Sequence, residues 1–336
     1  MSDEPEGLEE AISRAGWAGA AVHPLPGDAS FRRYFRLRRD NGEKPASAML
    51  MHAPPPEEDP APFLHVAHWL EKHGMRGPRI YFEDAGAGWV LLEDFGDDRM
   101  RDWLDRDPEA EQAAYETAVD ALVDLHQRPP GPFPPYDMDT YLREAGLLTQ
   151  WYAPAKGLDV DRNGYEAAWR EVLSPLLARQ AAPVTVLRDY HAENIMLLAD
   201  PRASSLASVA QGLIDFQDAL AGHRAYDLAS LLQDARRDVS EALEAAMLER
   251  YCERAVTDEH FRADYIRLAA QRNAKIIGIF TRLYKRDGKT RYLDLIPRVW
   301  GLLERDLADP VLEPVAHWFA ANIPENLRSS GGGSIL

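Results

Sequence analysis

The chain has 336 residues, of which 46% are hydrophobic and 28% are charged. This composition is ordinary for a folded globular enzyme and too apolar for an intrinsically disordered protein. The formal net charge of -17 argues against general binding to nucleic acid, because neutralising phosphates requires a basic surface. A single cysteine, Cys252, excludes an intrachain disulfide and fits a reducing compartment.

The length and the ends of the chain suggest where it resides and how it is organised. A chain of this length exceeds what one hydrophobic core usually serves, so two lobes are expected. The acidic N-terminus lacks the basic-then-apolar pattern of a signal peptide. No apolar run approaches the ~18 residues that span a bilayer. We therefore expect a cytoplasmic protein that is a monomer and contacts neither membrane nor nucleic acid.

Residues 1–95 are predicted to form a small β-rich N-lobe that binds nucleotide. A short helix is expected near residues 6–15 and a longer one over 59–73, where Phe63, Val66 and Leu70 share a face. Asp40-Asn41-Gly42 is a strong hairpin signal, because Asn and Gly adopt positive φ at low cost. Alternating or continuous apolar runs predict five strands, at residues 21–25, 31–39, 46–51, 79–82 and 89–92.

Residues 96–328 are predicted to form a larger helical C-lobe, followed by a flexible tail at 329–336. Apolar residues at helical spacing predict helices over 108–126, 137–151, 163–180, 226–235, 240–254, 259–282 and 292–307. Short strands are expected only at 184–187, 195–198 and 209–214. The sequence thus predicts an α+β fold with two lobes.

The most polar motifs of the chain lie between these three short strands. Asp189 follows the first strand, Asn194 starts the second, and Asp215 ends the third. Phosphoryl transfer requires a carboxylate that accepts the proton of the attacking hydroxyl and oxygen ligands for the magnesium ions on the phosphates. The spacing predicts Asp189 as the catalytic base and Asn194 and Asp215 as Mg²⁺ ligands, the arrangement described for protein kinases.

A structural interpretation competes with this one. Asp and Asn favour strand ends and turns, so each of the three residues alone would be read as a turn former. Three of them at these offsets, each beside an apolar strand, favour catalysis instead.

The chain resembles the superfamily of aminoglycoside phosphotransferases and choline kinases over nearly its whole length, which implies a bilobal protein-kinase-like fold. The superfamily usually has His-Gly-Asp before the loop, where this chain has Leu187-Arg188-Asp189, so Arg188 is expected to support the base. The resemblance also implies that Asp227 accepts hydrogen bonds from the catalytic loop. His191 and Glu193 are candidates for contact with substrate, although bracing of the loop is the favoured role of His191.

The nucleotide side departs from the kinase pattern. Residues 27–36 take the place of the phosphate-covering loop, with Ser30, Arg32 and Arg33 as candidate ATP contacts. Glu93 and Phe95 belong to the hinge expected to meet adenine through its backbone. The third strand has no lysine to pair with the phosphates, which leaves two alternatives. Either the protein is a pseudokinase, or an arginine of the first hairpin supplies the charge, as the intact trio favours.

The acceptor side is basic. Residues 267–298 contain nine basic and two acidic residues, a local charge of +7. On a helix, Arg272, Lys275 and Arg282 lie within ~80° of each other and form a basic stripe. A solvated face is the plainer interpretation. A basic site would suit an anionic or neutral sugar better than a cationic aminoglycoside.

At finer grain the chain resembles the bacterial anomeric kinases of N-acetylmuramate and N-acetylglucosamine. The resemblance is carried by the motifs Gly27-Asp-Ala-Ser-Phe-Arg-Arg-Tyr-Phe-Arg, Asp215-Phe-Gln-Asp, Gln271-Arg-Asn-Ala-Lys and Leu295-Ile-Pro-Arg. It implies ATP-dependent phosphorylation of the sugar at C1 during peptidoglycan recycling, and these kinases also lack the strand lysine. Antibiotic O-phosphotransfer is the alternative within the same enzyme class.

Overall fold

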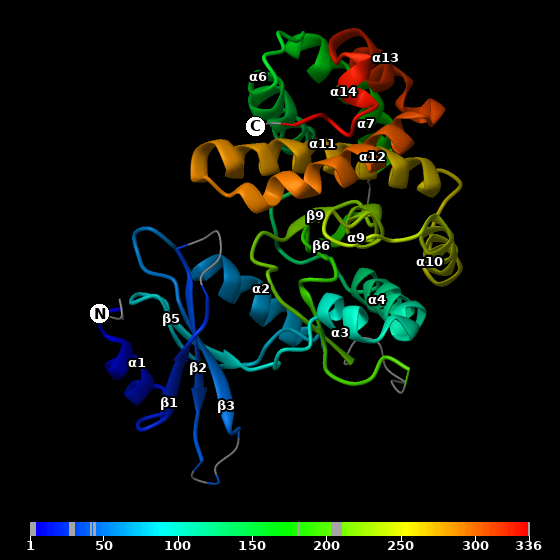
Figure 1. The fold of residues 1–336 in the computed structure, drawn as a ribbon. Helices are drawn as coiled ribbons and strands as arrows, with labels where there is room; N and C mark the ends of the chain where they lie inside the picture. The colour runs from blue at the N-terminus through cyan, green and yellow to red at the C-terminus, as the bar shows by residue number, and fades with distance from the viewer. Residues whose placement is uncertain are drawn as a thin grey trace. The chain divides into compact units, whose positions relative to one another are not determined.

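The computed structural model describes residues 5–26, 31–40, 42, 45–179, 182–202 and 210–334. These residues form two compact units. The first lies within Met1–Pro108 and Glu193–Asp218, and the second within Glu109–Ala192 and Ala219–Leu336. Figure 1 shows the ribbon of both units and labels many of their helices and strands.

The first unit is built on a five-stranded antiparallel sheet with the strand order β1-β2-β3-β5-β4. Arg33 of β2 lies opposite His52 of β3, and a bulge between Ile80 and Phe82 shifts the register of β4 on β5. The strands are β1 (Ala21–Pro24), β2 (Arg33–Arg38), β3 (Ser47–His52), β4 (Ile80–Asp84) and β5 (Trp89–Glu93). All five match the strands expected from the sequence.

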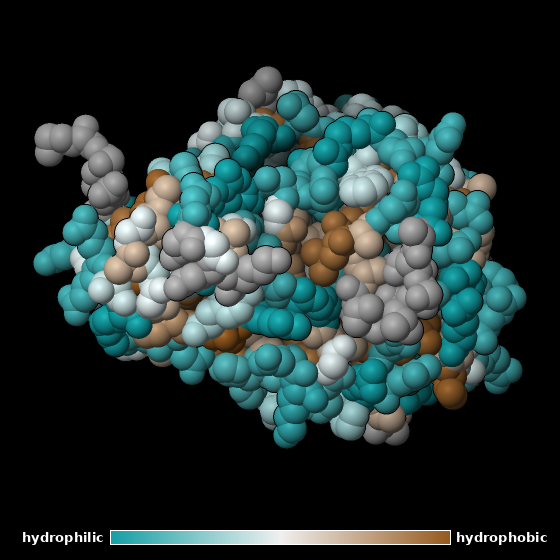
Figure 2. Space-filling model, turned by 90° about the horizontal axis from the view of Figure 1, so that it is seen from below, coloured by the Kyte–Doolittle hydropathy of each residue, from teal (hydrophilic) through white to brown (hydrophobic). Residues whose placement is uncertain are grey.

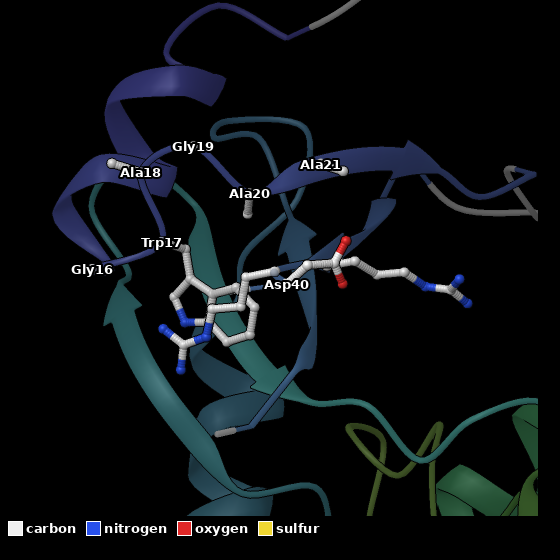
Figure 3. Close-up of a pocket in the computed structure, with 9 residues that line it drawn as sticks. Gly16, Trp17, Ala18, Gly19, Ala20, Ala21 and Asp40 are labelled. Atoms are coloured by element: carbon white, nitrogen blue, oxygen red, sulfur yellow. The ribbon is translucent and has the colours of Figure 1, made fainter. Parts of the chain in front are cut away.

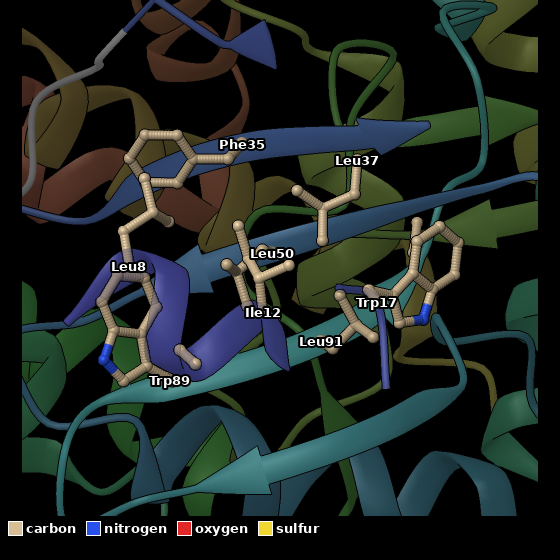
Figure 4. Close-up of a cluster of buried hydrophobic side chains, with 10 residues drawn as sticks. Leu8, Ile12, Trp17, Phe35, Leu37, Leu50, Trp89 and Leu91 are labelled. Atoms are coloured by element: carbon tan, nitrogen blue, oxygen red, sulfur yellow. The ribbon is translucent and has the colours of Figure 1, made fainter. Parts of the chain in front are cut away.

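One face of this sheet is buried against α1 (Leu8–Arg14), as Figure 4 shows. Side chains alternate across a strand, so Phe35 and Leu37 of β2 enter this core while Arg36 points to the opposite face. Leu8 and Ile12, one turn apart on α1, meet them. Burial of each large apolar side chain contributes ~1.5–3 kcal/mol, so this cluster fixes the sheet that carries the nucleotide-side residues.

The rest of the first unit consists of α2 (Ala61–Lys72), α3 (Met100–Arg106) and a hairpin of β7 (Ile195–Leu197) and β8 (Gln211–Leu213). The hairpin is joined to the N-terminal part of the chain by two backbone hydrogen bonds. Leu213 N–H donates to Arg76 O at 2.8 Å, and Leu197 N–H donates to Asp98 O at 2.8 Å. These bonds explain why Glu193–Asp218 belongs to the first unit.

The second unit is mainly helical. Its helices are α4 (Glu111–His126), α5 (Met138–Ala145), α6 (Ala153–Ala155), α7 (Arg162–Arg179), α9 (Ala225–Leu232), α10 (Glu241–Arg254), α11 (Phe261–Asp287), α12 (Ile296–Leu307), α13 (Glu313–Asn322) and α14 (Glu325–Arg328). Short 3₁₀ or π turns complete the chain, namely η1 (Pro108–Ala110), η2 (Leu148–Tyr152), η3 (Thr290–Leu295) and η4 (Pro310–Leu312).

The 27-residue helix α11 is the longest element of this unit and is buried along most of its length. It packs so closely on the start of η2 that a Cβ at Gly278 would lie 2.3 Å from the carbonyl carbon of Leu147. Only glycine fits there. The helix ends at Gly288, whose φ of 68° places it in the left-handed region typical of helix C-termini.

A two-stranded sheet carries the polar loop of the second unit. It pairs β6 (Val184–Val186) with β9 (Leu220–Gly222) in antiparallel register. All three residues of β6 are buried, so the chain leaves a fixed strand immediately before Leu187, Arg188 and Asp189.

The structure confirms the α+β class, with an antiparallel sheet in the N-terminal part and a helical C-terminal part. Five of the described α-helices and strands were not predicted from the sequence, namely α3, α6, α13, α14 and β9. The compact units divide the chain differently from the expected boundary at residue 95, because α3 and the β7–β8 hairpin group with the N-terminal residues, to which the hairpin is bonded at Arg76 and Asp98. The expected flexible tail is held through residue 334, where Tyr152 Oη donates to Gly332 O at 2.6 Å and Lys156 Nζ donates to Ser334 O at 2.6 Å.

Polar side chains dominate the face of the molecule seen in Figure 2, with smaller apolar patches between them. Among the described helices, none is both long and apolar enough to cross a bilayer.

Candidate active site

The loop that follows β6 is anchored by one buried carboxylate. Asp227, on α9, accepts the N–H of Leu187 at 2.6 Å and the N–H of Arg188 at 2.8 Å. Asp227 is completely buried, and burial raises its pKa to about 7, although the two backbone donors act in the opposite direction. These bonds tie the backbone before Asp189 to α9, and the supporting role of Asp227 in the reaction stays a prediction.

Backbone strain is concentrated at two of the predicted site residues. Among the described residues other than glycine, Arg188 and Asp215 alone have positive φ, at 71° and 60°. The left-handed region is unfavourable for most residues with a side chain, although less so for Asn and Asp, and such strain persists where surrounding contacts enforce it, commonly at functional sites. The two strained positions are a neighbour of the predicted base and a predicted metal ligand.

Asp189, the predicted base, is half-buried in the second unit. Its own N–H donates to Leu187 O at 2.9 Å, which tightens the turn directly after β6. The backbone on its N-terminal side is therefore fixed both by this bond and by Asp227.

His191 is 2% exposed, and burial lowers its pKa to about 3, so its imidazole is neutral. Its Nε2 accepts a hydrogen bond from Arg236 Nη1 at 3.3 Å. On the next residue, Ala192 N–H donates to Asp234 Oδ2 at 3.3 Å. This environment agrees with a histidine that braces the loop.

The side chain of Arg188 leads to a buried carboxylate that the sequence analysis missed. Its guanidinium forms an ion pair with Glu144 of α5, and Lys275 of α11 pairs with the same carboxylate at 3.1 Å. Burial alone would raise the pKa of Glu144, but Lys275 and Arg188 outweigh it and hold that pKa below its usual value. The available signal was a glutamate beside Tyr141 on the apolar face of a helix.

Asn194 and Asp215 meet in the first unit. They flank the β7–β8 hairpin, where Ile214 N–H donates to Asn194 O at 3.1 Å. Asn194 Nδ2 lies 3.3 Å from Asp215 Oδ2, and Gln217 Nε2 donates to Asp215 Oδ1 at 2.9 Å. The next residue, Phe216, is buried in a stack with Phe63 of α2 and so fixes the turn beneath Asp215. The structure brings the two predicted metal ligands together.

The donor set fits Mg²⁺ bound with a nucleotide. Mg²⁺ prefers oxygen ligands and is commonly held by one or two carboxylates together with phosphates and water. Asp215 is exposed and carries a carboxylate beside the amide of Asn194. No cluster of three His, Cys, Asp or Glu residues suited to a metal occurs in the described part of the chain.

Glu193 lies next to Asn194 in the first unit. Its carboxylate forms an ion pair with Arg101 of α3, and Arg101 also pairs with Asp102 at 2.7 Å. This contact attaches the hairpin to α3. Glu193 thus has a structural partner in addition to its expected role toward substrate.

The arginines of the first hairpin differ in their surroundings. Arg32 pairs with Glu58 at 3.4 Å, and its side chain is 12% exposed. Burial is the main cause of the raised pKa of Tyr34, which Arg32 lowers and Asp215 raises, so these groups share one electrostatic environment. Arg33, the next residue, is exposed and begins β2; burial and then the charge of Arg33 lower the pKa of His52, across the sheet. Ser30 lies outside the described residues.

The hinge is braced by two arginines. Arg76 binds both carboxylate oxygens of Glu93, at 2.6 and 2.5 Å, and lies over the ring of Phe95 at 4.9 Å. That ring packs against Gly212, where a Cβ would lie 2.6 Å from it. The sequence analysis missed the second brace, Arg36, which donates to Gly96 O at 3.1 Å and pairs with Asp94 and Asp97. The hinge backbone is thereby fixed.

The predicted basic stripe is largely buried. Arg272 is 3% exposed and donates to Gln233 O at 3.4 Å, and Lys275 is 7% exposed and donates to Tyr226 Oη at 3.1 Å. Arg282 is half-buried, and its pKa is lowered by burial and by the neighbouring Arg286. The interpretation of this stripe as a solvated face is therefore wrong for Arg272 and Lys275.

Two surface pockets lie apart from these candidates. One of about 630 Å³, shown in Figure 3, lies beside Trp17 and Asp40, where Arg39 stacks on the indole of Trp17 at 4.1 Å. The other, of about 330 Å³, lies between α5 and α7. Neither is lined by a predicted site residue.

The chain is similar to known proteins in sequence and in fold. Residues 21–265 match the model of the phosphotransferase enzyme family, APH. A protein of Caulobacter vibrioides named N-acetylmuramate/N-acetylglucosamine kinase is 35% identical, over 98% of this chain and 99% of that protein. One of the same name from Pseudomonas aeruginosa is 36% identical, over 90% of this chain and 89% of that protein. The fold is similar to that of a choline kinase from Streptococcus pneumoniae, with a TM-score of 0.61 and 13% identity over 92% of this chain and 98% of that chain.

Proposed function

The chain belongs to the phosphotransferase enzyme family, and from this premise we propose that it transfers the γ-phosphoryl group of ATP to the anomeric hydroxyl of N-acetylmuramate and N-acetylglucosamine. Such a reaction would return sugars released from peptidoglycan to metabolism. The names of its relatives support the sugar class. The C1 position and the place in peptidoglycan recycling are part of the proposal.

In this proposal Asp189 is the general base. Its carboxylate would accept the proton of the C1 hydroxyl as that oxygen attacks the γ-phosphorus, and the phosphoryl group would pass directly to the sugar with ADP as leaving group. No covalent enzyme intermediate is required. The anchoring of the preceding backbone by Asp227 supports this role, because a base acts efficiently only when its direction is fixed.

Asn194 and Asp215 would hold Mg²⁺, which when bound neutralises charge on the β- and γ-phosphates. Their separation of 3.3 Å and the exposure of Asp215 support this assignment. In kinases a lysine of the third strand supplies a positive charge to the phosphates, and β3 of this chain has no lysine. Arg32 would supply that charge instead. Its position in the environment shared by Tyr34 and Asp215 favours it over Arg33.

The braced hinge would bind the adenine. Because the side chain of Glu93 is occupied by Arg76 and the ring of Phe95 packs on Gly212, the contacts to adenine would come from the hinge backbone. Phe95 would keep that backbone in place. This arrangement agrees with a nucleotide recognised by hydrogen bonds to the main chain.

On the acceptor side, Arg282 is the member of the basic set with the greatest exposure. We assign it to the lactyl carboxylate of N-acetylmuramate, a group that N-acetylglucosamine lacks. Arg272 and Lys275 are buried, so they would affect sugar binding indirectly, through the residues to which they are bonded.

The observation that carries the proposal is the placement of strain. Of the described non-glycine residues, the two with positive φ adjoin or form the predicted base and metal ligand. If Asp189, Asn194 and Asp215 were only turn formers, there would be no reason for a strained arginine beside Asp189.

The test is to incubate the purified protein with ATP, Mg²⁺ and N-acetylmuramate and to identify the product by phosphorus NMR. A phosphate coupled to the anomeric proton is expected, with one ADP formed for each sugar phosphorylated. Phosphate at another carbon would overturn the C1 assignment. Consumption of an aminoglycoside or of choline, with the N-acetylated sugars inert, would overturn the substrate class.

A further inference from the structure

Arg188 holds a backbone conformation that glycine would adopt without strain. Its N–H is bonded to Asp227, but any residue except proline could make that bond. What distinguishes arginine here is its guanidinium, which extends to Glu144 on α5. The strained arginine is thus a link between the catalytic loop and a helix distant in sequence.

Glu144 is well built for such a link. It is 7% exposed, and its carboxylate receives Arg188, Lys275 and the hydroxyl of Tyr136. Tyr136 in turn stacks on Tyr141 with 4.0 Å between ring centroids, so the acceptor is enclosed by rigid groups. A buried carboxylate is stable only when its oxygens are paired, and here three donors serve them.

The network also lies close to the base. The charge of Asp189 acts on both cations of the network and helps to raise the pKa of Arg188 and that of Lys275. Arg188 further lies 5.9 Å above the ring of Tyr136. A displacement of the guanidinium would therefore alter both the direction and the electrostatic surroundings of the Asp189 carboxylate.

We propose that Glu144 is a positioning residue, which holds Arg188 in place and through it fixes the backbone that aims Asp189. The inference rests on the proposed function, in which Asp189 is the base. Glu144 contacts neither sugar nor nucleotide in this scheme. Its effect should appear in the rate of transfer rather than in substrate affinity.

The first measurement is the steady-state kinetics of Glu144→Gln with ATP and N-acetylmuramate. A misplacement of about 1 Å at a reacting group can cost about 100-fold in rate, so kcat should fall by roughly that factor. KM for ATP should stay within about twofold of the wild type. Unchanged kcat in a folded variant would overturn the proposal.

Glu244 provides a matched control. It is 8% exposed in the same unit, pairs with Arg305 at 2.6 Å and accepts a hydrogen bond from Tyr265 Oη at 2.7 Å. Glu244→Gln therefore imposes a similar loss of a buried carboxylate away from the loop. It should lower Tm comparably and leave kcat unchanged. An equal fall of kcat in both variants would mean that the effect is general destabilisation.

Arg188→Gly keeps the test decisive if Glu144→Gln fails to fold, because it relieves the strain and leaves Glu144 paired with Lys275. We expect a folded protein with kcat lowered by about 10-fold, since glycine frees the loop. In the double variant kcat should equal that of Glu144→Gln alone, because both changes break one link. Full activity of Arg188→Gly, or effects that multiply in the double variant, would overturn the proposal.

A readout independent of turnover separates this inference from the proposed function. Hydrogen exchange of the Leu187 and Arg188 amides should become at least about 10-fold faster in Glu144→Gln and stay unchanged in Glu244→Gln, because loss of the link frees local opening. If Asp189→Ala remains active, the proposed function fails whatever Glu144 does. If Asp189→Ala is inactive and the two glutamate variants behave alike, only the positioning role fails.

Discussion

In the second unit, the backbone that leads into Asp189 is tied to Asp227, a group with no exposed surface, whereas in the first unit Asn194 and Asp215 meet at an exposed position. The bonds near Asp189 are short, at 2.6 and 2.8 Å, and the separation of Asn194 from Asp215 is 3.3 Å. The two regions thus differ in how much of their geometry the protein alone determines.

We infer that the two regions contribute to different parts of the reaction. In the proposed function Asp189 is the base, and the buried contacts of the preceding backbone, which exist before any ligand arrives, would aim it; such preorganisation lowers the barrier to transfer. The geometry of the proposed metal ligands, Asn194 and Asp215, would be completed by the phosphates, as is usual for Mg²⁺ sites. Changes near Asp189 should then act on rate, and changes in the first unit should act on nucleotide binding.

Asp189→Ala should give the largest effect. Loss of a general base costs about 10²–10⁴-fold, so kcat should fall by about 10³-fold while the dissociation constant for ATP and Mg²⁺ changes by less than about twofold. Asp215→Ala should weaken both turnover and nucleotide binding. Rapid-quench kinetics and titration calorimetry measure the two quantities. Near-wild-type turnover of Asp189→Ala would remove the base assignment.

Asp227→Asn tests the buried anchor through pH. Burial raises the pKa of Asp227 to about 7, from about 4 in an unfolded chain. The folded state then binds the proton more tightly, so this contribution to stability is fully present below about pH 4 and is lost as the pH rises through about 7. Relative to Asp227→Asn, the free energy of unfolding of the wild type should fall by roughly 3 kcal/mol over that range. Urea titrations at several pH values measure it, and parallel curves would contradict it.

The fold could be predicted from local patterns, and the candidate site residues could be selected from their spacing. Alternation in Phe35 and Leu37 and the hairpin signal at residues 40–42 predicted the sheet, because one face of each strand must be buried. Asp189, Asn194 and Asp215 could be selected because their spacing reflects a constraint on phosphoryl transfer. Such patterns involve residues that are close in sequence, so they can be recognised without a structure.

Glu144, Arg36 and the burial of Lys275 could not be predicted in this way. A helical projection shows that Arg272, Lys275 and Arg282 share a face, but it does not show what covers that face. Lys275 is buried because Glu144, 131 positions earlier in the sequence, meets it. A lone charged residue on an amphipathic helix is normally solvated, so the exception depends on tertiary contacts.

Arg32→Ala tests which arginine meets the phosphates, with Arg33→Ala as its control. If Arg32 replaces the missing lysine, its loss removes a charge-assisted hydrogen bond to phosphate and should raise KM for ATP by about 10-fold. Arg33 is exposed on the neighbouring position, so its change should alter KM by less than about twofold. Equal responses of the two variants would contradict the choice of Arg32.

Arg282→Ala should give the smallest and most selective effect. A half-exposed arginine paired with a carboxylate contributes about 1 kcal/mol, so KM for N-acetylmuramate should rise by roughly 5-fold. KM for N-acetylglucosamine should stay constant, because that sugar has no carboxylate for the guanidinium to bind. Arg286→Ala, one turn along α11 and paired with Asp287 at 2.7 Å, is the control and should change neither value. Since the two sugars differ at the lactyl group, an equal rise for both would place Arg282 outside carboxylate recognition and assign its effect to a feature that the two sugars share.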